Sequence, residues 1–111
     1  YDWFNKDGSA RYDVAKEFNL PIIAHAALRT GAASALKPEA LSILKDANPD
    51  RSSVDWALRF VKSLDGIVSV TCNMHSVREV KENASVFNDT AKLSPEELNV
   101  LEACAKAQRE A

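Results

Sequence analysis

Residues 53–71 read Ser-Val-Asp-Trp-Ala-Leu-Arg-Phe-Val-Lys-Ser-Leu-Asp-Gly-Ile-Val-Ser-Val-Thr, and this stretch decides the fold class. Its apolar residues at i, i+3, i+4, i+7 and i+10 form one stripe of a helix: Val54, Ala57, Leu58, Val61 and Leu64. Ser52 and Ser53 are candidate N-caps, and Gly66 marks the end of the helix. The β-branched run 67–71 begins directly after the glycine and predicts a buried strand.

The residues before this stretch predict a second strand between two helices. Residues 9–18 have helical apolar spacing, with Ser9 placed as a cap. The proline-bounded run 21–26 is apolar on both faces, which is typical of a strand buried in a parallel sheet. The small-residue loop 29–34 leaves the end of that strand where ligands of α/β proteins usually bind. A helix is expected over 38–47, with proline at its first position.

Two capping boxes predict the last two helices. Ser76-Val77-Arg78-Glu79 opens a helix over 76–86, and Ser94-Pro95-Glu96-Glu97 opens one over 94–109. The last helix has an apolar face of Leu98, Leu101 and Ala105. The alternation of buried strands with amphipathic helices predicts an α/β domain with parallel strands. No domain boundary or repeat interrupts residues 1–111, so a single domain is expected.

Composition excludes several classes of function. The chain has 111 residues, with 14 Lys+Arg against 16 Asp+Glu and a net charge of −2, so no positive field attracts nucleic acid. The longest apolar stretch, 20–28, is too short to span a membrane, and we expect a soluble protein with no membrane partner. Cys72 and Cys104 form neither a disulfide scaffold nor a metal-ligand pattern, which favours a reducing, cytoplasmic compartment.

The turn 73–78 is the sharpest candidate site. It joins the end of a predicted strand to a capped helix, where amide groups, the helix dipole and Arg78 suit a phosphate. The alternative is an ordinary strand-to-helix turn in which Arg78 is only solvated. His25 lies near the end of an apolar strand, where it either faces a ligand or is simply hydrogen-bonded in place.

Three blocks resemble the C-terminal part of an aldo/keto reductase, in the branch with an iron–sulfur segment at its extreme C-terminus. Residues 21–31 look like the seventh barrel strand and its loop, 53–60 like the start of the seventh helix, and 70–83 like the eighth strand and the cofactor-binding helix. The resemblance implies an α/β fold, the part of a (β/α)8 TIM barrel from the end of strand 6 to the C-terminal helix. A full barrel needs about 250 residues, so the barrel is expected to be incomplete.

The resemblance also implies the cofactor-binding residues of an NAD(P)-dependent oxidoreductase. They are His25, Leu28, Arg29, Asn73, Ser76, Arg78, Glu82 and Asn83. His25 stands where many members place a tyrosine that stacks on the nicotinamide, and Glu82 and Asn83 match the pair that binds the adenine. Asn73 and Glu79 depart from the family pattern, so NADP and NAD both stay open, with Arg78 as a possible partner of a 2′-phosphate.

By the same resemblance, the catalytic Asp, Tyr, Lys and His precede Tyr1, so this chain carries no catalytic residue and is inactive alone. The substrate implied for the full-length protein is a small carbonyl compound, and an iron–sulfur cluster is expected only in a longer chain. Open strand edges predict that the piece self-associates. The alternative function is a noncatalytic packing or interaction module that has lost the dinucleotide site.

Overall fold

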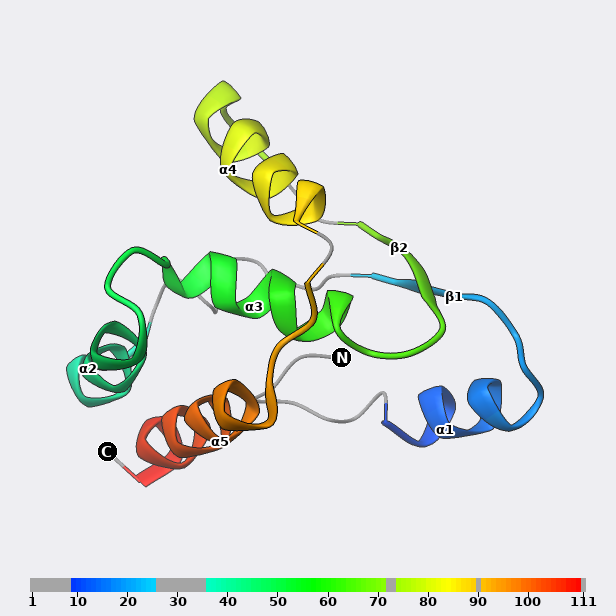
Figure 1. Cartoon of the computed structure of the whole chain (residues 1–111), viewed down its shortest axis with the longest axis horizontal. Coiled ribbons are helices and arrows are strands. Elements are labelled where there is room, and N and C mark those ends of the chain that lie inside the picture. Colours follow the sequence, from blue (N-terminus) through cyan, green and yellow to red (C-terminus); the bar gives the residue numbers. More distant parts are fainter. Residues whose placement is uncertain (1–8, 26–35, 72–73, 90, 111) are drawn as a thin grey trace.

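The computed structural model describes residues 9–25, 36–71, 74–89 and 91–110 (Figure 1). The elements run in the order α1 (Ser9–Glu17), β1 (Ile22–Ala24), α2 (Pro38–Ala47), α3 (Ser53–Lys62), β2 (Ile67–Val70), α4 (Val77–Asn88) and α5 (Pro95–Glu110). Each predicted helix and strand is present; α2 has the expected bounds, and each of the other elements differs by a few residues at one or both ends. Within these ranges, no helix is long and apolar enough to cross a membrane.

The two strands lie side by side and run in the same direction, as the sequence predicts. Ile22 pairs with Ile67 and Ala24 with Val70, and the register shifts after Ile22. The Thr71 amide donates to the Ala24 carbonyl at 2.8 Å, which extends the ladder one residue beyond β2. Because α2 and α3 lie between the strands along the chain, the unit is a βαβ crossover.

The caps predicted at Ser52 and Ser94 form where the sequence places them. Ser52 Oγ accepts from the Asp55 amide at 3.1 Å at the start of α3. At the start of α5, Ser94 and Glu97 each accept a hydrogen bond from the other's amide at 3.1 Å, which is a complete capping box. These bonds join residues three apart, so local sequence determines them.

The core lies among the helices rather than in the sheet. Its largest fully buried side chains come from α2, α3, α4 and α5: Trp56, Leu44, Leu58, Leu101, Val61, Val86 and Cys104. Lys37, just before α2, donates from its backbone to Gln108 Oε1 (2.9 Å) and from Nζ to the Gln108 carbonyl (3.0 Å), so the start of α2 is tied to the end of α5.

The prediction that both strands are buried on two faces is wrong. Ile23 is 64% exposed and Val68 66% exposed, because the described helices that pack near the sheet leave most of the surface of these two side chains uncovered. The expected buried face of α1 is also absent, since Val14 and Phe18 are exposed. In α5, Leu101 and Ala105 are buried as predicted, whereas Leu98 is exposed.

Gly66 connects α3 to β2 through a left-handed backbone conformation, with φ of +85°. A Cβ there would make only ordinary contact with Ile22 Cδ1, at 3.7 Å, so space is not the constraint. We expect Gly66→Ala to lower the free energy of unfolding by about 1–2 kcal/mol, because an L side chain is strained in this conformation. Urea unfolding measures the loss; the exposed-site variant Ser42→Ala is the control and should stay within about 0.5 kcal/mol of the wild type.

Candidate functional site

The carboxyl ends of the two parallel strands bring His25 and Thr71 together. His25 Nδ1 lies 2.8 Å from Thr71 Oγ1, and both side chains are exposed. The contact joins residues 46 positions apart and exists because β1 and β2 end at the same edge of the sheet. His25 is therefore hydrogen-bonded, as one alternative predicted, and its ring is also accessible to a ligand.

A second group of predicted binding residues lies at the N-terminus of α4, which Figure 1 shows at the outer end of that helix. Ser76 Oγ accepts from the Glu79 amide at 3.1 Å, so the predicted serine cap is confirmed. Glu79 Oε2 accepts from the amide of His75 at 2.7 Å, one residue before the partner that a standard capping box uses. The capped helix end carries the positive end of the helix dipole, which favours a bound anion.

The residues expected to hold the adenine and a phosphate are divided between two faces of α4. Arg78 Nε donates to Glu82 Oε1 at 3.1 Å, and both side chains lie at the surface. Asn83 is buried, with 5% exposure. Successive helical residues point about 100° apart, so the side chain of Asn83 points toward the core, whereas that of Glu82 points toward solvent. The structure thus brings Arg78 and Glu82 together and places Asn83 elsewhere. Their roles in binding stay predictions.

Three predicted cofactor residues, Leu28, Arg29 and Asn73, lie outside the described residues. Thr71 is a further candidate site residue, because it bonds His25, and the sequence analysis did not single it out. Its position at the end of a strand parallel to 21–26 was the available signal, since equivalent ends of parallel strands meet at one edge. At its described positions the site offers a helix dipole, an arginine, hydroxyl groups and an imidazole, which suits binding of a phosphate-bearing ligand.

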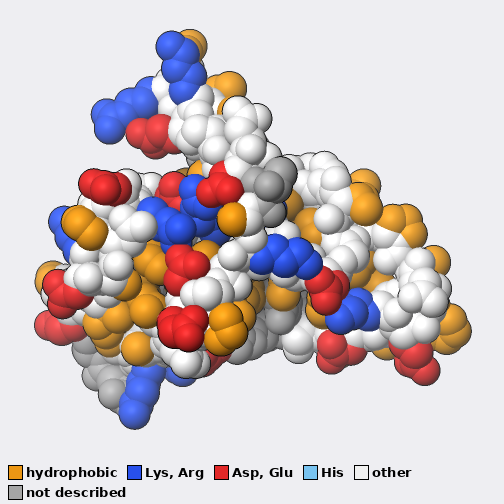
Figure 2. Space-filling model, in the orientation of Figure 1, with side chains coloured by type: hydrophobic (Ala, Val, Ile, Leu, Met, Phe, Trp, Pro, Cys, Tyr) orange, Lys and Arg blue, Asp and Glu red, His pale blue; other side chains and the backbone are white. Residues whose placement is uncertain are grey.

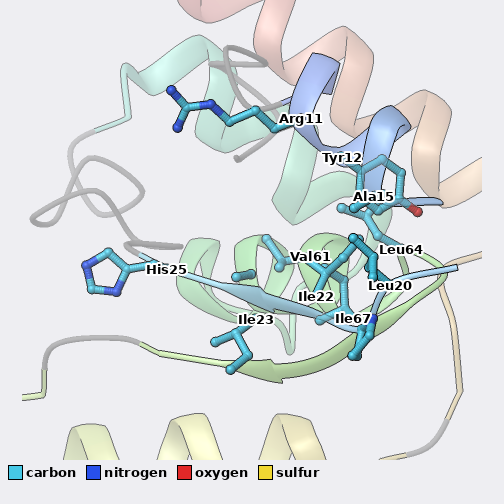
Figure 3. A pocket seen from close by; sticks show the side chains of 12 residues that line it. Arg11, Tyr12, Ala15, Leu20, Ile22, Ile23, His25, Val61, Leu64 and Ile67 are labelled. Atoms are coloured by element: carbon cyan, nitrogen blue, oxygen red, sulfur yellow. The ribbon is translucent and has the colours of Figure 1, made fainter. Parts of the chain in front are cut away.

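Two of the hollows among the described residues border the sheet, and His25 is part of the lining of the first. One, of about 340 Å³, lies between α1, β1 and α3 and is mostly apolar, with Arg11 and His25 toward one end (Figure 3). The other, of about 500 Å³, follows β2 between Lys62, Phe87 and Lys92. Each strand has only the other as a neighbour in the described sheet, whereas every strand of a closed barrel has two. The hollows lie along these open sides.

The architecture is that of a partial TIM barrel, with parallel strands separated by helices and the candidate site at the strands' carboxyl ends. Comparison with solved structures agrees. The aldo-keto reductase AKR11C1 from Bacillus halodurans matches in its holo form with a TM-score of 0.73 and 19% identity, over 96% of this chain and 41% of that one. Its apo form matches with a TM-score of 0.72, 19% identity and coverages of 96% and 42%.

The thermostable aldo-keto reductase Tm1743, in complex with the inhibitor epalrestat, matches with a TM-score of 0.72 and 18% identity, over 94% of this chain and 37% of that one. This chain is thus similar in fold to aldo-keto reductases, as predicted, and spans about two fifths of the length of those it matches. These matches do not support the narrower prediction of an iron–sulfur branch. No protein-family model and no curated protein matches the sequence.

Proposed function

We propose that this chain is part of an NAD(P)-dependent oxidoreductase of the aldo-keto reductase type and contributes part of its dinucleotide site. The observation that carries the proposal is the capped N-terminus of α4, which follows a parallel strand and has the exposed Arg78 in its first turn. Helix termini of this kind hold the phosphates of nucleotides. The similarity in fold to aldo-keto reductases supports the choice of a dinucleotide.

In this proposal four of the described residues serve the dinucleotide site. The α4 amides and Arg78 hold a phosphate, Glu82 accepts from the adenine amino group, and Ser76 keeps the helix start in place. His25 offers a flat ring to the nicotinamide, and its contact with Thr71 limits rotation of that ring. The dinucleotide, when bound, supplies or accepts a hydride. This chain's own residues bind and orient it.

The remaining parts of the proposal concern the whole protein. The substrate is a small carbonyl compound or alcohol, and the catalytic residues are expected outside this chain, which would be inactive alone. A cytoplasmic location is part of the proposal, since the two cysteines, Cys72 and Cys104, form no disulfide scaffold in the sequence. Both NADP and NAD are compatible with the described residues. Arg78 is the residue that would distinguish the two cofactors, by binding the 2′-phosphate of NADP.

Charge-removing variants of α4 test the dinucleotide site in the full-length protein. We expect Arg78→Ala and Glu82→Ala each to raise the Kd of NADPH by about tenfold, because each removes a charge-assisted hydrogen bond. Titration of nicotinamide fluorescence measures the change. The matched controls Arg109→Ala and Glu96→Ala, on α5, should leave the Kd unchanged. If Arg78 holds a 2′-phosphate, its loss weakens NADPH binding more than NADH binding.

A second candidate function is a noncatalytic packing or interaction module. The burial of Asn83 favours it, since a side chain expected to bind adenine is enclosed by protein. Under this alternative, neither dinucleotide gives a saturable fluorescence change with the full-length protein, and the Arg78 and Glu82 variants behave like their controls. That result would reject the oxidoreductase proposal.

A further inference from the structure

Among the described residues, the packing that holds helix α4 lies toward its C-terminal end. Its buried residues, Asn83 and Val86, both lie in its C-terminal half, where it packs against α3. In its first turn, Val77 is 72% exposed and the Arg78 side chain 87% exposed. Figure 1 shows α4 extending away from the other elements, with its N-terminal end outermost. The half that carries the proposed dinucleotide residues therefore has little packing of its own.

Two cations of α3, Arg59 and Lys62, hold the C-terminal end of α4. Lys62 Nζ donates to the carbonyl of Val86 at 2.9 Å and also to the carbonyl of Asp89, where α4 ends. Arg59 Nη1 donates to the Asp89 carboxylate at 2.7 Å, and its Nε donates to Asp55 on its own helix. Figure 2 shows basic and acidic side chains side by side where α4 meets α3. We call these four residues, 55, 59, 62 and 89, the α3–α4 clamp.

The clamp is more than a surface ion pair. The Arg59 side chain is only 13% exposed and bonds two carboxylates at once, which fixes its planar guanidinium. Burial would lower the pKa of Arg59, but its hydrogen bonds to Asp89 and Asp55 outweigh burial and raise it. The same bond from Arg59 lowers the pKa of Asp89. Lys62 adds a positive charge at the C-terminal end of α4, where the helix dipole favours one.

The clamp and the proposed binding residues lie at opposite ends of one rigid element. From Asn83 to Ser76 the helix rises about 10 Å, so a small tilt at the C-terminal end displaces the N-terminal end. We propose that Arg59 and Lys62 are positioning residues, which fix the place of α4 and thereby of the dinucleotide-binding residues in its first half. The part concerning dinucleotide binding rests on the proposed function.

Removal of the two positive charges tests the clamp in the full-length protein. Arg59→Met and Lys62→Met keep the aliphatic stems and remove the donors. The control is Arg51→Met, since Arg51 is also a partly buried cation bonded to a carboxylate, but that carboxylate is Glu97 in the first turn of α5 and not a residue of α4. Two properties are measured: hydrogen exchange of the α4 amides relative to those of α5, and the Kd of NADPH.

We expect both clamp variants to speed α4 exchange at least tenfold relative to α5 and to raise the Kd about fivefold or more. The control should leave both the exchange of the α4 amides and the Kd unchanged. In a double-mutant cycle, the effects of Arg59→Met and Asp89→Asn on the Kd should be strongly non-additive, because the two residues act through one bond. If either variant fails to fold, the other is decisive.

The outcomes separate the clamp from the proposed function. If the α4 amides of both clamp variants exchange no faster than those of the Arg51 control, the positioning role is overturned. Faster α4 exchange with an unchanged Kd would overturn its link to dinucleotide binding. If the wild-type protein binds no dinucleotide, the proposed function fails, and the exchange measurement still decides whether Arg59 and Lys62 position α4.

Discussion

Trp56→Ala should lower the free energy of unfolding by about 3–5 kcal/mol, the largest effect expected of any single change in this protein. The Trp56 side chain is 1% exposed and is the largest of the fully buried side chains in the helical core. Alanine would remove most of that volume and leave a cavity, because neighbouring helices cannot close over it completely. The guanidinium of Arg51, 4.9 Å from the indole ring centroid, would also lose its aromatic partner.

A second substitution at the same position separates volume from hydrogen bonding. The indole Nε1 of Trp56 is buried with no hydrogen-bond partner among the described atoms. Trp56→Phe keeps an aromatic ring and removes this unpaired donor, so we expect a loss of only about 1 kcal/mol. Urea unfolding of both variants measures the difference. A loss below about 1 kcal/mol for Trp56→Ala would mean that the core is not packed around this residue.

Lysine at the exposed strand positions should convert an associating protein into a monomer. Ile23 and Val68 are large, apolar and mostly exposed on a two-stranded sheet whose outer sides have no strand partner in the described structure. Unpaired edges and exposed apolar side chains promote association between copies. We propose that the 111-residue chain self-associates through this sheet. The wild type should sediment as oligomers at about 100 µM, and Ile23→Lys with Val68→Lys mainly as monomer.

The control for this experiment adds the same charge elsewhere. Ser42 is exposed on α2, away from the sheet, so Ser42→Lys should leave the association unchanged. A wild-type chain that is monomeric at high concentration would contradict self-association. If the Ser42→Lys variant dissociates as much as the Ile23→Lys, Val68→Lys variant, net charge rather than the sheet controls self-association.

Burial was harder to predict than secondary structure. The run 21–26 is apolar on both faces, yet Ile23 is exposed, because burial of a strand depends on what packs over it and not on its own residues. The reverse holds for Asn83, a polar residue that the structure buries. The resemblance placed it beside Glu82 in a binding role, while the rotation of the helix separates the two side chains.

The amino-acid sequence by itself determined the order of helices and strands, the caps at Ser52, Ser76 and Ser94, and the parallel α/β class. These features depend on residues within a few positions of each other, through apolar spacing and hydrogen bonds of short range. Only the tertiary structure brought His25 to Thr71 and Arg59 to Asp89, pairs separated by 46 and 30 positions. Such contacts require two packed elements with fixed relative positions, which no local pattern specifies.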